Sequence, residues 1–213
     1  WAKQRNLPRI KGHMEGNKRV KEIINATMEL KIRYLTLYVF STENWQRPKN
    51  EVNYLMNSLY RYLKTEEKKF MKNKIKLVVI GQIERLPEKI QRRLKQLIYK
   101  TRNNSVLILN LALSYGAREE ILMAVNHLRK SKKYINESDF SKNLYTKDIP
   151  DPDLVIRTSD EIRISNFLLW QIAYSELYFI KVLWPDFRKK NFLEAIIEYQ
   201  SRERRFGKVL AKE

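Results

Sequence analysis

The sequence predicts an α/β fold, a single domain in which helices flank a central and mainly parallel β-sheet. Short runs of β-branched and aromatic residues alternate along the chain with longer amphipathic segments, which is the pattern of β-α-β units. The 213 residues are enough for one sizeable core, and no repeat or linker divides them. We therefore expect residues 1–213 to form one domain.

The first half of the chain is expected to form a helix, a strand and a second helix. Apolar residues at three- and four-residue spacing over 14–30 indicate an amphipathic helix. Residues 34–40 are β-branched and aromatic, which predicts a buried strand, and this run ends abruptly in the polar residues 41–48. A long helix with one apolar face begins near Asn50 and continues through Leu63.

Four more strands are expected in the rest of the chain, most of them separated by helices. The predicted strands are 76–80, 106–112, 154–156 and 177–179. The predicted helices are a basic one that begins at Pro87, one over 119–128, a short apolar one capped by Ser165, and a last one over 190–205. Residues 130–151 are polar and irregular, and we expect them to be the most mobile segment.

The chain is strongly basic, with 43 Lys and Arg against 24 Asp and Glu and a formal net charge of +19. Between Arg61 and Arg102, 14 basic residues accompany four acidic ones. Such a face suits nucleic acid or an anionic membrane, or it is simply a solvated helical face, which the composition favours. The absence of cysteine excludes disulfides and cysteine-bound metal. No apolar run approaches the roughly 20 residues that span a bilayer.

The polar segments that follow three of the predicted strands each carry an arginine. These arginines are Arg47, Arg118 and Arg157. Ligands of parallel sheets bind outside the carboxyl ends of the strands, so these side chains are expected to rim one cleft. Arginine matches phosphate geometry, which points to a phosphate or diphosphate ligand. The alternative is that Arg157 and Arg163 pair with Asp153, Asp160 or Glu161 in a surface loop. Neither a nucleotide-binding glycine loop nor a DDxxD magnesium motif is present.

Several separate motifs resemble those of one enzyme family. They are Trp1-Ala-Lys with Arg9 and Gly12-His13, the run from Phe40 to Pro48 with Glu51-Val52, Tyr115 to Ile121, Asp151 to Leu154, Trp184 to Phe187, and Arg202 to Gly207. In this order and spacing they resemble the cis-prenyltransferases, the family of undecaprenyl diphosphate and dehydrodolichyl diphosphate synthases. The resemblance covers nearly the whole chain, from Trp1 to Gly207.

The resemblance implies a homodimeric, Mg²⁺-dependent transferase. Such an enzyme extends farnesyl diphosphate or a similar allylic diphosphate by repeated cis addition of isopentenyl diphosphate, and its polyprenyl diphosphate product serves as a glycosyl-carrier lipid. It implies the cis-prenyltransferase fold with a hydrophobic tunnel for the prenyl chain, to which Val39, Leu55, Leu59 and Leu63 would contribute. We expect a cytoplasmic or organellar protein, soluble or peripheral to a membrane, with no nucleic-acid partner.

The resemblance also assigns residues of the allylic half of the site. Three residues near the start of the chain would lie at the allylic diphosphate: Trp1, Arg9 and His13. Without the resemblance, Trp1 would be interpreted as part of an N-terminal tail and Arg9 as a surface charge. His13 would be interpreted as a histidine that lies in the core or caps a helix. The loop after the first predicted strand would position the substrate, or it is simply the turn that ends that strand. Its residues are Ser41, Thr42, Glu43, Asn44, Trp45 and Arg47. Asn44, Ser41 and His13 are the candidate catalytic residues. An amide such as Asn44 is a poor base unless it relays the proton.

The second half of the implied site is the segment after the fourth predicted strand. Arg157, Arg163 and Ser165 match residues that bind isopentenyl diphosphate, and Arg205 would reach the partner subunit's site. Glu176 matches a magnesium-associated glutamate, although a single carboxylate is also an ordinary surface residue.

Two departures from the family pattern affect these expectations. The family's Asp-Gly-Asn-x-Arg loop and its strand precede the Trp-Ala-Lys motif, and Asp160 stands where the family has glycine. Because every other motif is kept, we expect the loop to precede Trp1 in the whole protein rather than the chain to be an impaired relative. A carboxylate between two diphosphate-binding arginines would repel the ligand, so Asp160 predicts weakened isopentenyl diphosphate binding unless it points away.

Two other functions remain open at this point. One is a non-catalytic partner subunit that keeps the fold and supports an active homologue. The other is a basic nucleic-acid-binding domain, which rests on charge alone because no recognition motif is present.

Overall fold

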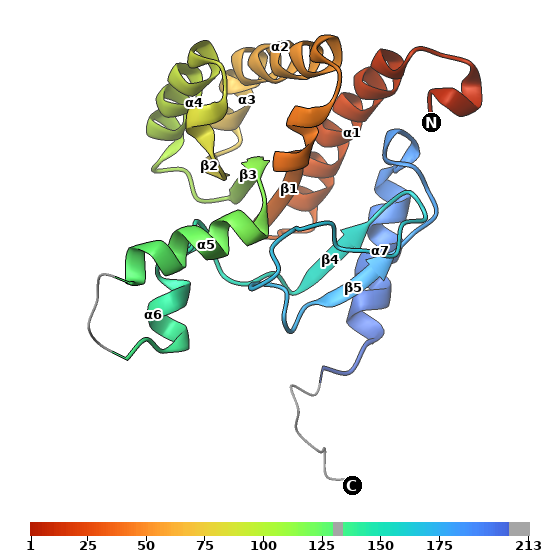
Figure 1. Ribbon diagram of the computed structural model, residues 1–213. Coiled ribbons are helices and arrows are strands. Elements are labelled where there is room, and N and C mark those ends of the chain that lie inside the picture. The colour runs from red at the N-terminus through yellow and green to blue at the C-terminus, as the bar shows by residue number, and fades with distance from the viewer. Residues whose placement is uncertain (130–133, 205–213) are drawn as a thin grey trace, which may run out of the picture.

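The computed structural model describes residues 1–129 and 134–204, and it has the predicted α/β architecture (Figure 1). Its helices are α1 (Arg9–Glu29), α2 (Lys49–Thr65), α3 (Glu67–Lys72), α4 (Glu88–Thr101), α5 (Ala117–Leu128), α6 (Glu137–Ser141) and α7 (Lys189–Ser201). Its strands are β1 (Tyr34–Ser41), β2 (Ile75–Ile80), β3 (Leu107–Tyr115), β4 (Leu154–Arg157) and β5 (Glu176–Phe179). Four 3₁₀ helices complete it: η1 (Lys3–Arg5), η2 (Thr42–Gln46), η3 (Ile83–Arg85) and η4 (Trp184–Asp186).

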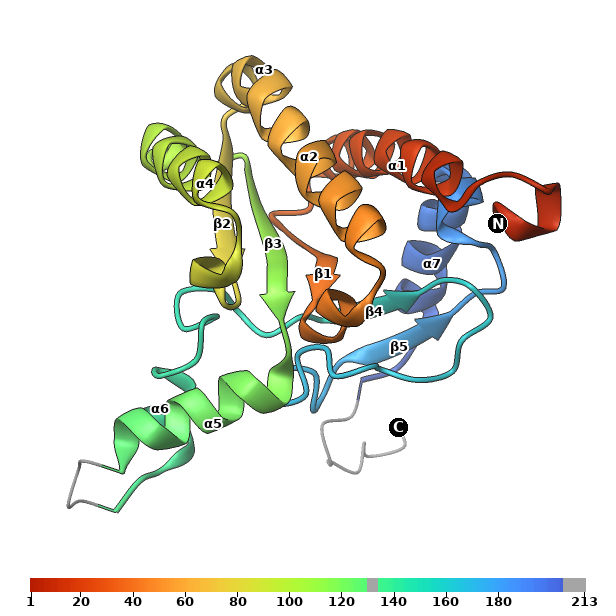
Figure 2. The ribbon, with the colours of Figure 1, turned by 45° about the horizontal axis from the view of Figure 1, so that its top comes forward.

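All five predicted strands are present and pair in parallel. They form two sheets, one with the order β1-β3-β2 and one that pairs β4 with β5. The register of β1 shifts on both sides of Phe40, so the strand is irregular where it leads into η2. In Figure 2 the arrowheads of β1 and β3 point away from α3. The carboxyl ends of these strands therefore lie together at the edge opposite α3.

The main core lies between the three-stranded sheet and the helices α2 and α4. On α4, Ile90, Leu94 and Leu97 are fully buried, as the predicted apolar face requires. They pack in one cluster with Leu77 of β2 and Leu109 of β3. Burial of aliphatic side chains of this size contributes about 1.5–3 kcal/mol each. This core fixes the edge at which the polar strand ends gather.

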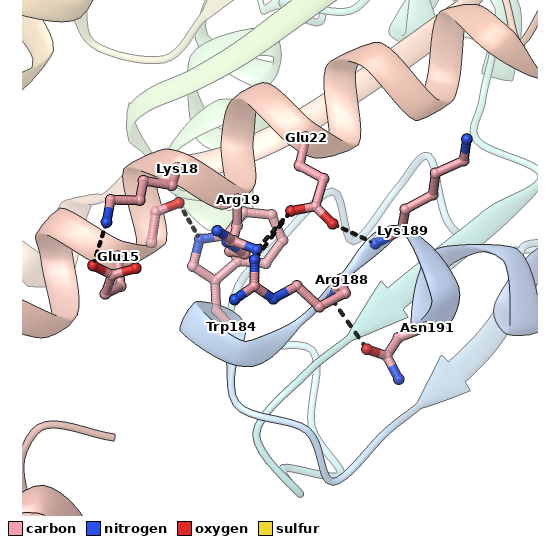
Figure 3. Close-up of polar contacts among 9 residues, drawn as sticks. Glu15, Lys18, Arg19, Glu22, Trp184, Arg188, Lys189 and Asn191 are labelled. Atoms are coloured by element: carbon pink, nitrogen blue, oxygen red, sulfur yellow. Dashed lines mark hydrogen bonds and ion pairs between the residues drawn. The ribbon is translucent and has the colours of Figure 1, made fainter.

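The segment around η4 joins α1 to the C-terminal part of the chain (Figure 3). The indole nitrogen of Trp184 donates to the Gly16 carbonyl at 3.1 Å, and a Cβ at Gly16 would lie 3.0 Å from the Trp184 ring. Glu22 accepts from the Lys189 backbone nitrogen at 2.8 Å and pairs with the buried Arg19. These contacts fix the position of α1, whose first turns carry Arg9 and Gly12-His13.

One predicted helix is absent, and several boundaries differ. Residues 165–175 form turns instead of the predicted apolar helix, because Ser165, Asn166 and Leu168 have φ of 53°, 60° and 47°. Left-handed backbone of this kind interrupts a helix. The helix α1 begins at Arg9, before the predicted start at residue 14, and α7 ends at Ser201.

The polar segment 130–151 contains the short helix α6, which was not predicted. Residues 130–133, part of the segment expected to be mobile, lie outside the described residues. No helix within 1–129 or 134–204 is long and apolar enough to cross a bilayer.

Candidate active site

A cavity of about 1280 Å³ lies against β1, α1, α2 and β4. Every β1 residue from Tyr34 to Phe40 lines it, so it follows the strand along its length. At the carboxyl ends of the strands its walls carry Arg9, His13, Arg47, Arg157, Thr158, Ser159 and Arg163. Toward the start of β1 the lining becomes apolar, with Leu30, Ile32 and Leu59. The cavity thus joins a cationic end to an apolar end.

Glu51 of α2 gathers the basic side chains on one side of the cationic end. Its carboxylate lies 3.4 Å from an Arg9 nitrogen, 3.3 Å from His13 Nε2 and 3.1 Å from an Arg47 nitrogen. The Glu51 side chain is 11% exposed, whereas Arg9 is 79% exposed. Burial acts to raise the pKa of the Glu51 carboxyl, but the hydrogen bond from His13 and the charge of Arg47 outweigh it and hold the pKa below its usual value. Glu51 is therefore ionised at neutral pH and orients these groups.

The η2 loop supports the cavity wall from behind. Asn44 Oδ1 accepts from the Ser41 backbone nitrogen at 3.2 Å, which with Ser41 forms a capping box. Trp45 donates to Ser114 Oγ at 2.9 Å and packs edge-on against Phe40. Of the predicted loop residues, Arg47 alone is part of the cavity lining. The turn interpretation of this loop therefore describes Ser41 and Asn44 well, and a supporting role is compatible with it.

Two acidic side chains connect the η2 loop to its neighbours. Thr42 donates to Glu119 of α5 at 3.3 Å, and Glu43 accepts from Asn166 Nδ2 at 3.0 Å. Burial acts to raise the pKa of the Glu43 carboxyl, but hydrogen bonds from Asn166 and from the loop itself outweigh it and lower the pKa. Glu43 therefore stays charged and acts as a fixed acceptor.

The end of β4 and the loop after it carry the second pair of arginines. Arg157 and Arg163 both line the cavity. The loop turns back through Ser159 and Asp160, which have φ of 80° and 56°, and their backbone nitrogens donate to Val182 and Ile180 at 2.9 and 3.2 Å. Arg163 forms an ion pair with Glu161. Both predicted interpretations hold in part, because the arginines reach the cavity and one of them also has an acidic neighbour.

Asp160 points away from the main cavity. It is exposed and lines a separate, smaller hollow with Lys181 and Asp186. The left-handed φ of Asp160 explains why glycine suits this position. With Asp160 directed away from the cavity, we expect it not to repel a diphosphate bound between Arg157 and Arg163.

Asn166 ties three segments together, and the sequence did not single it out. Its backbone carbonyl accepts from the Ala117 nitrogen at 2.8 Å, and its Oδ1 accepts from the Arg118 nitrogen at 2.9 Å. Its Nδ2 donates to Glu43 and also to Glu119, at 3.2 Å. Asn166 therefore positions the arginine loop against η2 and α5. The available signal was its position directly after Ser165, a residue predicted both to cap a helix and to bind isopentenyl diphosphate.

Other predicted residues are distributed around the cavity. Trp1 lines it, and its indole nitrogen donates to Asp186 at 2.7 Å. Ser165 and Arg118 are exposed and outside the lining. Glu176 begins β5, three residues before the level of Arg157, and pairs with Arg202 at 2.9 Å. Arg205 lies outside the described residues.

The apolar part of the cavity includes most of the predicted tunnel residues. Val39, Leu55 and Leu59 line it, together with Leu35 and Leu37. Leu63 is fully buried and belongs to the core instead. A hydrocarbon chain placed here would contact aliphatic side chains from both β1 and α2.

Comparison with known proteins assigns this arrangement to a family. The family model described as "Putative undecaprenyl diphosphate synthase" matches residues 1–207. The chain belongs to this family. It is 54% identical over 210 residues to the isoprenyl transferase of Fusobacterium nucleatum, with 98% of this chain and 91% of that protein covered. It is 47% identical over 212 residues to the isoprenyl transferase of Thermotoga maritima, with 97% and 91% covered.

Solved structures of the family have the same fold. Lavandulyl diphosphate synthase from Lavandula x intermedia, crystallised with dimethylallyl diphosphate, superposes with a TM-score of 0.94 at 34% identity, covering 98% of this chain and 93% of that one. A probable undecaprenyl diphosphate synthase from Campylobacter jejuni gives 0.83 at 40% identity, covering 92% and 93%. The predicted enzyme class, a cis-prenyltransferase, and its α/β fold are confirmed.

Proposed function

We propose that the chain condenses isopentenyl diphosphate with an allylic diphosphate, farnesyl diphosphate or a similar one, in repeated cis additions. The product is a long polyprenyl diphosphate that serves as a glycosyl-carrier lipid. The observation that carries this proposal is the cavity, which joins a cationic end for two diphosphates to an apolar end for a growing chain.

In the proposed reaction, the allylic C–O bond breaks and a new C–C bond forms to isopentenyl diphosphate, which then loses a proton. Charge develops on the leaving diphosphate, so the donors of Arg9, His13 and Arg47 stabilise the transition state when they are already aligned. Glu51 supplies that alignment through its three contacts. Arg157 and Arg163 hold isopentenyl diphosphate in attacking position, an entropic contribution to the rate.

The three candidate catalytic residues divide into two roles in this proposal. His13 lines the cavity, which supports a role in direct contact with the diphosphate. Ser41 and Asn44 are held in the capping box behind the wall, so they position the loop. Release of the proton to the departing diphosphate, through His13 or water, does not require the amide to act as a base.

Mg²⁺ is the proposed cofactor, bound mainly by the substrates. Among the described residues no group of three metal-binding side chains occurs, and Glu176 is engaged by Arg202. These residues do not by themselves form a magnesium site. Mg²⁺ commonly takes its ligands from phosphate oxygens and water with only one or two carboxylates, so it would enter bound to diphosphate.

The test is product analysis by mass spectrometry, with the protein purified together with any residues that precede Trp1 in its gene. We expect farnesyl and isopentenyl diphosphates with Mg²⁺ to give a series of longer polyprenyl diphosphates. An inactive chain that stimulates an active homologue would support the partner-subunit alternative instead. No product and no stimulation would contradict both.

We also propose that two copies form a homodimer. Apolar side chains are exposed on α5 and on the segment after the arginine loop, with Leu122 at 61%, Val125 at 47% and Tyr174 at 72% exposed. Leu122 and Val125 are three residues apart and therefore lie on one face of α5, which favours that face as the interface. Sedimentation of the wild type should give a dimer, and Leu122→Asp with Val125→Asp should give a monomer. A monomeric wild type would contradict this proposal.

A further inference from the structure

The amino ends of β1, β2 and β3 lie at the edge opposite the candidate active site, and the segments that enter them are basic. Lys31 and Arg33 precede β1, Lys72 and Lys74 precede β2, and Arg102 precedes β3. No acidic residue occurs in 30–34, 68–76 or 101–107. Lysines at helix ends are common because they interact with the helix dipole. That explanation suits Lys72, but it does not apply to Arg33 and Lys74, which lie beyond the helix ends.

Backbone hydrogen bonds hold these three segments side by side. The Val106 nitrogen donates to the Lys74 carbonyl at 3.0 Å, and the Ile108 nitrogen donates to the Arg33 carbonyl at 2.8 Å. The cations therefore form one surface, which we call the basic edge and define as Lys31, Arg33, Lys72, Lys74 and Arg102.

The nearest acidic groups do not neutralise the basic edge. Glu66 is buried and pairs with Lys21 at 2.6 Å and with Lys69 at 3.4 Å. Glu67 pairs with Arg93 and with Lys100 at 2.6 Å. Glu29, two residues before Lys31, pairs with Lys189. Each of these three carboxylates therefore has a cationic partner outside the basic edge. The surface therefore keeps its positive charge.

Apolar side chains are exposed among these cations. Leu30 is 38%, Met71 45%, Tyr99 65% and Val106 51% exposed. The Arg102 guanidinium lies over the Tyr99 ring, 3.9 Å from its centroid. Lys and Arg interleaved with Tyr, Met and aliphatic residues is the composition of surfaces that rest in the headgroup region of a bilayer. A solvated helical face, the interpretation that composition alone favours, does not require these exposed apolar groups.

The apolar end of the cavity reaches the same edge. Leu30 belongs to the cavity lining as well as to this surface, and Ile32 and Tyr34 line the cavity beside Lys31 and Arg33. We propose that the basic edge docks on an anionic phospholipid bilayer, so that the cavity delivers a growing prenyl chain toward the membrane. The delivery rests on the proposed function, whereas the docking does not.

The experiment measures binding to vesicles without any substrate, so that its outcome is independent of catalysis. Sedimentation is compared for vesicles of phosphatidylcholine alone and vesicles with an equal part of phosphatidylglycerol. We expect binding to the anionic vesicles only, and weaker binding at high salt. The variant K31Q/R33Q/K72Q/K74Q should bind the anionic vesicles roughly 100- to 1000-fold more weakly, since each cation near an anionic surface contributes up to about tenfold to the affinity.

A matched control removes the same number of charges elsewhere. The variant R129Q/K142Q/K147Q/K181Q changes exposed residues that belong to none of the three basic segments; Lys181, for example, lines the small hollow beside Asp160. It should bind like the wild type. Equal losses in the two variants would show that net charge alone attracts the vesicles, which would overturn the proposal. So would unchanged binding of the first variant, or binding to RNA but not to vesicles.

Discussion

The two sides of the cationic end of the cavity are built differently. On the α1 and α2 side, one carboxylate, Glu51 of α2, contacts Arg9 and His13 of α1 and Arg47, which directly follows η2. On the β4 side, Arg157 ends the strand and Arg163 lies in the loop that follows, which contains left-handed residues and is connected to its neighbours by Asn166. The first side is organised around one carboxylate on a helix, and the second depends on loop geometry. We therefore expect the allylic side of the site to lose function when its charged side chains are removed. The isopentenyl side should lose function on removal of its arginines and also when the contacts that hold the loop are removed.

The largest expected effect is on the loop side. Arg157→Ala and Arg163→Ala should each lower kcat/KM for isopentenyl diphosphate roughly 10- to 150-fold, because a hydrogen bond to a charged group is worth about 1.5–3 kcal/mol. The KM for the allylic substrate should change little. Arg118→Ala is the control, since Arg118 also follows a strand but lies outside the cavity lining. Full activity in both variants would refute the assignment of these arginines.

The next effect concerns the carboxylate on the helical side. Glu51→Gln should lower kcat about tenfold, which corresponds to about 1.4 kcal/mol, because Arg9, His13 and Arg47 lose their common partner. Steady-state kinetics should show an unchanged KM for isopentenyl diphosphate. Glu88→Gln is the control, because Glu88 also pairs with an arginine but is 77% exposed on α4. A change in both KM values would indicate general damage to the cavity.

The same carboxylate predicts a pH dependence of stability. Because the pKa of Glu51 is lower in the folded chain than its usual value, its ionised form stabilises the fold at neutral pH. The contribution of Glu51 to the free energy of unfolding is complete at pH values above the usual carboxyl pKa. It is lost as the pH falls through the lowered pKa of the folded state. The difference in Tm between wild type and Glu51→Gln should be constant near neutral pH and shrink as the pH falls below roughly 4. A difference that grows in acid would contradict this sign.

A smaller effect is expected for the residue that holds the arginine loop. Asn166→Gly keeps the left-handed backbone but removes the side-chain bonds to Glu43, Glu119 and the Arg118 nitrogen. We expect a roughly threefold to tenfold higher KM for isopentenyl diphosphate, as hydrogen bonds of about 0.5–1.5 kcal/mol are lost. The KM for the allylic substrate is the internal control. Equal shifts in the two would show that Asn166 has no selective role.

The smallest effect separates two adjacent acidic residues. Glu161→Gln frees Arg163 from its ion pair and should lower the KM for isopentenyl diphosphate by roughly threefold or less, since exposed pairs are worth about 0–1 kcal/mol. Asp160→Gly should leave that KM unchanged and raise the stability by about 1 kcal/mol, because glycine tolerates φ of 56°. A lower KM for Asp160→Gly would show that Asp160 faces the ligand after all.

The parts of the fold with regular periodicity could be predicted from the sequence. The apolar faces of α2 and α4 and the five strands follow from spacing and residue type. The turns at 165–175 could not be, because the same apolar residues suit a short helix, and the tertiary bonds of Asn166 decide between the two. The division into two sheets was also not visible, since local pattern does not specify which strands pair.

The anion-binding character of the site could be predicted, because arginines near strand ends indicate a phosphate or diphosphate ligand. Arg47 and Arg157 reach the cavity because both follow strand ends, yet Arg118, in an equivalent position, does not. The difference is that the chain enters α5 directly after β3, so Arg118 lies in a first helical turn on the exposed side. The role of Glu51 as a common partner of three cations depends on how α1 packs beside α2, which spacing along the chain does not show.

We expect two sets of arginines to bind the two different diphosphates. Calorimetry with farnesyl thiodiphosphate, which resists ionisation, and separately with isopentenyl diphosphate tests this expectation on Arg47→Ala and Arg163→Ala. We predict a crossed pattern, in which Arg47→Ala weakens the allylic analogue at least roughly tenfold and Arg163→Ala weakens isopentenyl diphosphate to a similar extent. Loss of affinity for the same ligand in both variants would contradict this expectation.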